Sequence, residues 1–248
     1  MTYLQAPLPD VVDRDTWLNQ VDELRVREKA HTREGDAIAA ARRRLPMVEV
    51  DPTVTVVGPD GPVPLRAVFE GRRQLYVYFH MWHDGHAHEG QCEGCTFFNG
   101  QVRELSYLHS RDVTYATFCQ GEYHESVQYR DFMGWDVPWY SARDSADALL
   151  AGRQVGMMHL VCYLRHGDRV FETYWTTRRG VEMLDNSYRL LDLTAFGRQE
   201  PWEDSPPGRP RQWRTDDPHH LRMRTHGRPT AQWSRIDAGR SDDLTGPS

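Results

Sequence analysis

The residues best able to do chemistry gather in one short stretch of the sequence. Cys92 and Cys95 form a Cys-x-x-Cys motif. The segment just before it carries four histidines, His80, His83, His86 and His88. Two thiols at this spacing can form a redox-active pair, and thiolates together with imidazoles can bind a metal ion. The stretch therefore predicts either thiol redox chemistry or a metal site.

The motif lies at a predicted strand-to-helix junction. It follows the β-rich run Gln74–Phe79 and opens a predicted helix that extends from Cys92 to about Leu108. Unpaired N–H groups and the positive dipole end of a helix N-terminus favour a thiolate, although Glu93 opposes this effect. We expect Cys92 to be the attacking thiol and Cys95, one turn along, to be the resolving thiol. A structural zinc half-site or two unreactive cysteines are the alternatives.

The metal hypothesis uses the same residues in another way. Thiolates and imidazoles suit copper(I) or zinc better than magnesium or calcium. The candidate ligands are His80, His83, His86, His88, Cys92, Cys95 and His159. Copper is preferred over zinc, in a protein that stores or delivers metal or in a copper-dependent oxidative enzyme. The thiol hypothesis requires no cofactor. The alternative to metal binding for His86 and His88 is a solvated loop whose imidazoles bind nothing.

The elements that must position these residues alternate along the chain. The predicted strands after Gln74–Phe79 are Asp112–Cys119, Val137–Ser141, His159–Leu164 and Arg169–Trp175. The predicted helices are Cys92–Leu108, Glu125–Met133 and Val181–Leu191. The order β-α-β-α-β-β-β-α implies an α/β fold, a mixed sheet with helices on both faces, and with right-handed crossovers it fits the thioredoxin-like plan.

The topology adds further candidates at one edge of that sheet. Parallel strands share the edge at which they end, where ligands usually bind, and Cys119 ends the second strand there. The antiparallel hairpin starts at the same edge, so Met157, Met158 and His159 are expected to approach Cys92. The alternatives are core packing for the two methionines, a buried core histidine for His159 and a small buried hydrophobe for Cys119.

Three regions are expected along the chain. Residues 1–44 form an N-terminal helical extension, 45–196 the thioredoxin-like domain, and 197–248 an irregular, partly disordered C-terminal tail. The extension reads as helix from Asp15 to about Arg44, with a division at Gly35. Such a helix could pack on the domain or pair two copies as a homodimer.

Composition excludes several classes of protein. The 248 residues carry 36 acidic and 30 basic side chains, a net charge of -6, which argues against general nucleic-acid binding. No apolar run is long enough to span a membrane, and the first residues lack the pattern of a signal peptide. We expect a cytoplasmic protein whose cysteines do not form structural disulfides.

Several motifs together resemble a known family. They are Leu45–Val50, Gln91–Thr96, Tyr107–Val113, Asp131–Trp135, Pro138–Ser141 and Leu191–Thr194. Over about Ala30 to Trp202 the sequence is similar to the DUF899 family of thioredoxin-like proteins, often labelled predicted dithiol-disulfide oxidoreductases. The resemblance implies a thioredoxin/peroxiredoxin-like fold in which Cys92 and Cys95 match the family's dithiol.

Two features depart from these resemblances. The loop before Cys92 is richer in histidine than is usual for the family. Gly156–His159 stands where thioredoxins place a cis-proline, which weakens the analogy with a general dithiol reductant. A cysteine pair with a histidine before the hairpin also resembles Sco-type copper proteins, although their cysteine spacing differs.

Three functions follow in order of preference. The first is a dithiol-disulfide oxidoreductase that acts on a thiol, disulfide or small-molecule substrate, without nucleic-acid or membrane partners. The second is the copper or zinc protein. The third is a partner-binding scaffold in which the thiols are idle.

Overall fold

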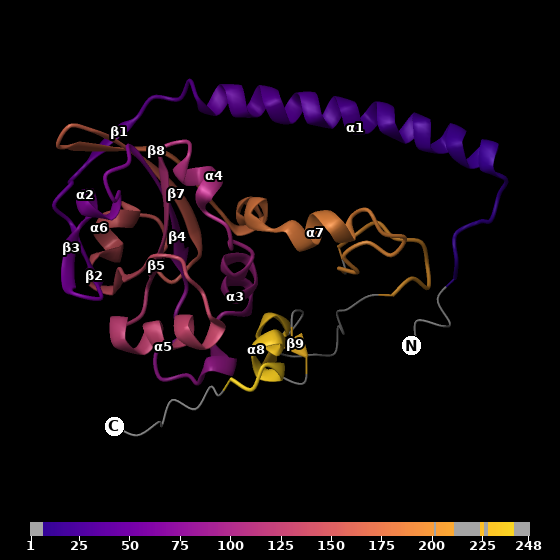
Figure 1. Cartoon of the computed structure of the whole chain (residues 1–248). Helices are drawn as coiled ribbons and strands as arrows, with labels where there is room; N and C mark the ends of the chain where they lie inside the picture. Colours follow the sequence, from indigo (N-terminus) through magenta and orange to yellow (C-terminus); the bar gives the residue numbers. More distant parts are fainter. Residues whose placement is uncertain (1–6, 201, 211–223, 226–227, 241–248) are drawn as a thin grey trace.

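A mixed β-sheet forms the centre of the computed structural model, which describes residues 7–200, 202–210, 224–225 and 228–240 (Figure 1). Within these residues the sheet has eight strands. In order across it they are β1 (Val48–Val50), β8 (Arg169–Thr177), β7 (His159–His166), β4 (Gln74–His80), β5 (Val113–Cys119), β6 (Trp139–Ser141), β2 (Thr55–Gly58) and β3 (Gly61–Pro64). The β4–β5 and β5–β6 pairs are parallel and the other pairs are antiparallel.

The core of this sheet has the thioredoxin arrangement. The first strand of this unit is β4. It lies between its parallel partner β5 and the antiparallel strand β7, which continues as a hairpin into β8. The order β8-β7-β4-β5 agrees with the thioredoxin-like plan that the predicted element order fits. The run Leu75–His80 is largely buried, as expected for a central strand covered on both faces. The predicted α/β, thioredoxin-like fold is therefore confirmed.

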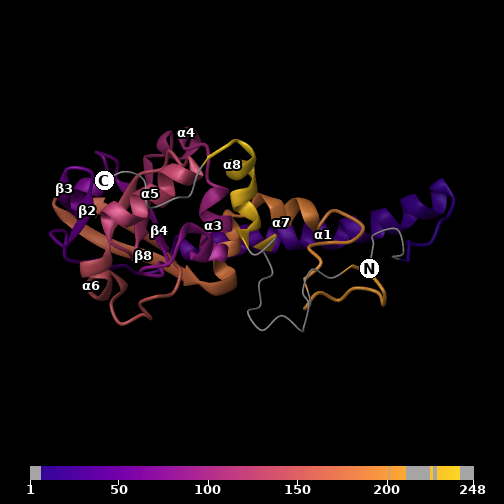
Figure 2. The ribbon, with the colours of Figure 1, turned by 90° about the horizontal axis from the view of Figure 1, so that it is seen from below.

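Helices cover both faces of the sheet (Figures 1 and 2). On one face, α3 (Glu93–Gly100) and α5 (Tyr123–Met133) join an aromatic-rich core that contains Tyr78, Cys95 and Cys119. On the other face, α2 (Leu65–Val68) and α6 (Ala146–Leu150) pack over an aliphatic core that includes Phe79. Alternate residues of β4 therefore point into different cores, which decides where each site residue faces.

The N-terminal extension is one continuous helix, α1 (Arg14–Arg42), which projects beyond the sheet domain (Figure 1). Asp13 caps it by accepting a hydrogen bond from the Thr16 N–H at 2.9 Å. The predicted division at Gly35 is absent, since the helix runs through that position. No residue of α1 is buried, and pairing of two copies through it stays a prediction. No helix among the described residues has the length and apolarity that crossing a membrane needs.

Two predicted helices are interrupted. The helix after Cys92 ends at Gly100, a residue of low helix propensity, and α4 (Ser106–His109) follows separately. The predicted helix Val181–Leu191 is a 3-10 turn, η4 (Arg178–Leu184), followed by α7 (Asn186–Leu191). Asp185 separates the two because its side chain caps α7, accepting from the Tyr188 N–H at 3.1 Å. Two more 3-10 turns are η2 (His88–Gly90) and η3 (Arg143–Ser145).

The C-terminal segment contains structure that the sequence did not predict. After β9 (Arg224–Thr225) come β10 (Arg228–Pro229), η5 (Thr230–Gln232) and α8 (Trp233–Asp237). Gln232 is fully buried beside α5, donating to the Tyr129 hydroxyl at 3.0 Å. Residues 228–240 are therefore folded within the tail for which partial disorder is expected, while 211–223, 226–227 and 241–248 lie outside the described residues.

Candidate active site at Cys92 and Cys95

Cys92 occupies the N-cap position of α3. Its sulfur accepts a hydrogen bond from the Cys95 N–H at 3.4 Å. Its carbonyl oxygen accepts from the Thr96 hydroxyl at 2.9 Å, which holds the first turn of the helix around it. The predicted placement of the motif, after β4 and at the start of a helix, is therefore what the structure has.

The two thiols have opposite acidities. The pKa of Cys92 lies below its usual value, chiefly because Cys95 donates its thiol hydrogen to the Cys92 sulfur. Burial opposes this effect, the N–H groups of Cys95 and Gly94 support it, and the Glu93 charge weakly opposes it. The pKa of Cys95 lies well above its usual value because the thiol is buried. This asymmetry suits an attacking thiolate at Cys92 and a protonated thiol at Cys95.

Burial separates the two sulfurs further. Cys95 is fully buried, and its sulfur accepts from the Met81 N–H at 3.3 Å. Cys92 is half-buried, with its sulfur 3.7 Å from the thioether sulfur of Met81. Of the two sulfurs, that of Cys92 is therefore the more accessible from solvent.

Cys92 lines a cavity of about 350 Å³. The predicted approach of the hairpin is confirmed for Met157 and Met158, which line the same cavity. Its remaining walls are Glu93, Gly94, Phe98, Arg178, Arg179, Glu182 and Tyr188. The cavity thus combines an apolar surface with two guanidinium and two carboxylate groups next to the more acidic thiol.

The two arginines of the cavity differ in how they are held. Arg179 donates to Glu182 at 2.8 Å and lies over the Trp202 ring at 4.1 Å. Arg178 is exposed, adopts a left-handed backbone with φ of 52°, and makes no ion pair or hydrogen bond with the part of the chain that the structure describes. Its positive charge is therefore available at the cavity.

The histidine loop is held by Gln91, which is fully buried. Its side-chain oxygen accepts from the His83 N–H at 3.0 Å, and its Nε2 donates to the carbonyl oxygens of His83 and His86 at 3.0 and 3.1 Å. The rings of His83 and His86 lie 5.6 Å apart, away from the cavity lining. Gln91 therefore fixes the loop through its backbone.

His80 is a buried aromatic partner within the core. It has no exposed surface, its Nδ1 contacts the Met81 carbonyl oxygen at 2.6 Å, and its ring lies 5.4 Å from Trp139 and 6.0 Å from Trp135. Burial lowers the pKa of His80 to about 4. The ring is therefore neutral at physiological pH.

His88 and His159 pack against aromatic side chains and do not line the Cys92 cavity. His88 is buried against Tyr129 and Phe132, at 5.1 Å from each ring. Residues directly opposite each other on neighbouring strands point to the same face of a sheet. His159 pairs with Phe79, which lies in the aliphatic core, so His159 faces away from the core that contains Tyr78 and Cys95. Its Nε2 contacts the Gln154 carbonyl oxygen at 2.9 Å and its ring packs on Trp175. The expectation that His159 approaches Cys92 is therefore wrong.

The predicted metal ligands are thus spread over a core, a loop and two faces of the sheet. Among the described residues, no three or more His, Cys, Asp or Glu side chains are grouped so that they could hold a metal ion. The two other cysteines also lie apart from the cavity lining. Burial raises the pKa of Cys119 and that of Cys162 to about 12.

Several contributors to the site were not predicted. Arg178 and Tyr188 reach the cavity from elements that follow the hairpin, and Gln232 ties the histidine loop to α5. Gln91 had one usable signal, its position directly before the motif. The other three had none, since their approach depends on how the last third of the chain folds back.

Comparison with known proteins gives a family and a set of distant structural likenesses. Among curated proteins, none matches the sequence. Peroxiredoxin Q from Xanthomonas campestris is 14% identical over 55% of this chain and 92% of its own, with a TM-score of 0.37. A putative thiol:disulfide interchange protein DsbE from Chlorobium tepidum is 13% identical over 56% of this chain and 93% of its own, with a TM-score of 0.39. A thiol:disulfide interchange protein from Bacteroides sp. is 17% identical over 63% and 94%, with a TM-score of 0.38.

Likenesses this distant add nothing to the strand order described above, which itself establishes the fold. The family match is of a different kind, because it extends over most of the chain. The model for "Bacterial protein of unknown function (DUF899)" matches residues 6–219. The chain belongs to the DUF899 family.

Proposed function

We propose that the protein is a dithiol-disulfide oxidoreductase in which Cys92 is the nucleophile and Cys95 the resolving thiol. The observation that carries the proposal is the asymmetry of the pair at the start of α3. Cys92 is half-buried on a cavity with a lowered pKa, and Cys95 is fully buried with a raised pKa. No contact among the described residues favours the metal-binding or scaffold alternatives in the same way.

The chemistry is an exchange of two electrons between sulfurs. The Cys92 thiolate attacks one sulfur of a substrate disulfide, the substrate S–S bond breaks, and the departing thiolate takes a proton from solvent. Cys95 then loses its proton and attacks the Cys92 sulfur, so that the mixed disulfide breaks and the second substrate thiol leaves. The substrate disulfide is reduced, the Cys92–Cys95 disulfide forms, and an external dithiol reductant restores the two thiols.

Each half of this cycle has a structural counterpart. The Cys95 N–H and thiol stabilise the Cys92 thiolate before attack. The Met81 N–H, 3.3 Å from the Cys95 sulfur, can stabilise the thiolate that forms there when Cys95 is deprotonated. Met157, Met158 and Phe98 offer an apolar wall for the substrate beside the attacking sulfur.

Trapping the intermediate tests the proposal. A Cys95→Ser variant should react with 5,5′-dithiobis(2-nitrobenzoate) and stop at a stable mixed disulfide on Cys92, because the resolving sulfur is gone. The wild type should instead proceed to a Cys92–Cys95 disulfide that carries no adduct. Peptide mapping by mass spectrometry distinguishes the two products. An adduct found on Cys119 or Cys162 rather than Cys92 would refute the assignment.

The charge of Arg178 predicts a preference among disulfides. An Arg178→Gln variant should react about two- to fivefold more slowly with the dianionic 5,5′-dithiobis(2-nitrobenzoate), since an attractive charge at the cavity is lost. Its rate with uncharged 4,4′-dithiodipyridine should change little. Stopped-flow rates for both reagents at low and high salt measure the effect. Equal slowing with both reagents would show that Arg178 acts through structure and not through charge.

A further inference from the structure

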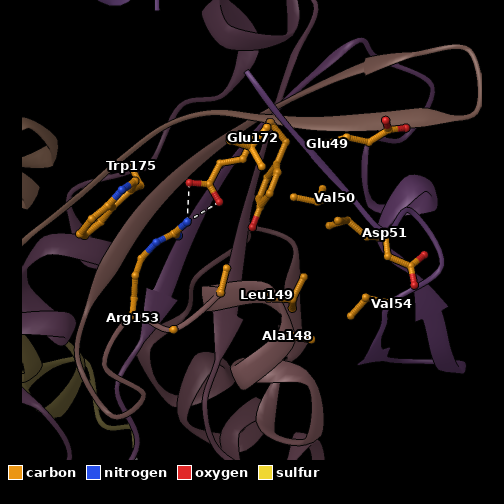
Figure 3. Close-up of a pocket in the computed structure, with 14 residues that line it drawn as sticks. Glu49, Val50, Asp51, Val54, Ala148, Leu149, Arg153, Glu172 and Trp175 are labelled. Carbon is orange, nitrogen blue, oxygen red and sulfur yellow. Dashed lines mark hydrogen bonds and ion pairs between the residues drawn. The ribbon is translucent and has the colours of Figure 1, made fainter. Parts of the chain in front are cut away.

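Figure 3 shows a second cavity, of about 710 Å³. Its residues Leu65, Leu149 and Tyr163 belong to the aliphatic core, on the face of the sheet opposite Cys92. It is bordered by the edge strand β1, the following segment up to Val54, the hairpin β7–β8, and α6 with the turn after it, and it is open to solvent on one side. Most of its surface is apolar, and Figure 3 shows Val50 and Val54 on one side facing Leu149 and Ala148 of α6. The proposed redox site uses none of the residues that line it.

A buried ion pair stands inside this apolar cavity. Arg153 donates to both carboxylate oxygens of Glu172, and the two side chains are only 13% and 11% exposed. The Arg153 guanidinium also stacks over the Trp175 ring, with 4.8 Å between them. Figure 3 shows this pair spanning the cavity beside Trp175. The charge of Arg153 is therefore neutralised within the cavity.

Two hydrogen-bond donors at the cavity have no acceptor. The hydroxyl of Tyr163, a residue only 2% exposed, makes no hydrogen bond within the described residues. Nη1 of Arg153 likewise makes no hydrogen bond with the described residues. Buried polar groups are nearly always paired, and leaving one unpaired costs about 1–3 kcal/mol. Tyr163 and Arg153 both line the cavity, so a ligand that brings an acceptor to these two buried donors would pair them.

The charges around the cavity limit what the ligand can be. Its lining holds three carboxylates, those of Glu172, Glu49 and Asp51, against the single guanidinium of Arg153. Glu49 already pairs with Arg169 at 2.8 Å, and Asp51 accepts from the Thr53 hydroxyl at 2.7 Å. An anion would meet a net negative surface, and the face of Trp175 that could attract a cation is occupied by Arg153.

We propose that this cavity binds an uncharged, largely apolar small molecule through an oxygen that accepts hydrogen bonds from Tyr163 and Arg153. The molecule's apolar body would lie against Val50, Val54 and Leu149. A ketone, an ester or an amide has the required acceptor. The site is independent of the proposed redox function, because it lies on the other face of the sheet and contains no thiol.

Fluorine NMR with para-fluoroacetophenone as the probe tests the proposal on the full-length protein. The ketone should show saturable line broadening with a dissociation constant of about 1 mM, a usual affinity for so small a ligand. Two analogues of similar shape serve as comparisons. Para-fluoroethylbenzene lacks the acceptor, and para-fluorobenzoate carries a negative charge. Both should bind at least about threefold more weakly than the ketone.

Two variants locate the binding. Tyr163→Phe removes only the hydroxyl and should weaken ketone binding about 3- to 10-fold. Because that hydroxyl is unpaired in the free protein, the variant should unfold at no lower a temperature than the wild type, which separates lost binding from lost folding. Ala148→Phe fills the cavity from an exposed position and should weaken binding at least about tenfold. Asp147→Phe adds the same bulk next to it, outside the cavity lining, and should leave binding unchanged.

The proposal is overturned if the ketone shows no saturable binding. It is overturned equally if Tyr163→Phe binds the ketone as tightly as the wild type does, or if Asp147→Phe weakens binding as much as Ala148→Phe. Tighter binding of the benzoate than of the ketone would reject an uncharged ligand class.

Discussion

Replacing Cys92 by serine is expected to lower disulfide-reductase activity at least about a thousandfold. A serine hydroxyl at the same N-cap position keeps the geometry of α3, but it does not ionise under conditions in which the Cys92 thiol does. Loss of a nucleophile commonly removes nearly all of the rate that the site provides. The measurement is the turnover of a disulfide substrate with dithiothreitol as the reductant.

The same change at another cysteine provides the control. Cys162 lies within β7, with a thiol whose pKa burial raises to about 12, and it does not line the Cys92 cavity. Cys162→Ser should retain activity within about twofold, since that thiol is un-ionised at neutral pH. If Cys92→Ser keeps the wild-type rate, or Cys162→Ser loses it, the assignment of the nucleophile is wrong.

The second large effect concerns acid stability and the buried ring of His80. The pKa of His80 is about 4 in the folded protein, against about 6.5 in an unfolded chain. Between these values the unfolded state binds more protons, so the free energy of unfolding falls as the pH decreases. Titration of His80 leaves the free energy of unfolding unchanged above pH about 6.5. It lowers that free energy by about 2 kcal/mol at pH 5 and by about 3 kcal/mol in all below pH about 4.

Variants at two histidines isolate this contribution. His80→Phe keeps an aromatic ring among Trp135 and Trp139 but removes the titration, at the cost of the contact with the Met81 carbonyl oxygen. At pH 7 the free energy of unfolding of the variant should be about 1 kcal/mol below that of the wild type. Between pH 7 and pH 5, however, that free energy should fall by about 2 kcal/mol less in the variant than in the wild type. His124→Phe, on the exposed surface of α5, should keep the wild-type pH slope. Urea denaturation at the two pH values measures these differences. An equal loss of stability in His80→Phe and the wild type would contradict the account.

The sequence predicted the sheet and the location of the dithiol because both depend on local signals. The apolar run Leu75–Phe79 marks a central strand, and the Cys-x-x-Cys motif directly before a helical pattern marks the start of α3. Element order and the handedness of crossovers then leave few arrangements of the strands. The positions of Cys92, Met157 and Met158 at one edge of the sheet followed from that reasoning.

The placement of the histidines could not be predicted in the same way, because it depends on register. A one-residue difference in pairing moves a side chain to the other face of a sheet. His159 pairs with Phe79 and therefore faces Trp175, whereas His80 faces the aromatic core. Element order specifies the edge at which these residues lie but not their faces.

Long-range contacts set the remaining limit on prediction from the sequence. His88 is buried beside α5 by a segment much later in the chain, where Gln232 donates to its carbonyl oxygen at 2.9 Å. Tyr188 and Arg178 likewise reach the cavity only because η4 and α7 fold back against α3. No periodicity in these segments signals such contacts.

The rate of Cys92 alkylation by iodoacetamide as a function of pH measures whether Cys92 is the more acidic thiol of the pair. Only a thiolate reacts, so the midpoint of the rate profile reports the acidity of the group. We expect a midpoint for Cys92 below that of an ordinary cysteine, with Cys95 unmodified over the same range. Glu93→Gln should move the midpoint lower still, since a neighbouring negative charge is removed. A Cys92 midpoint at or above the ordinary value, or alkylation of Cys95 before Cys92, would contradict the account.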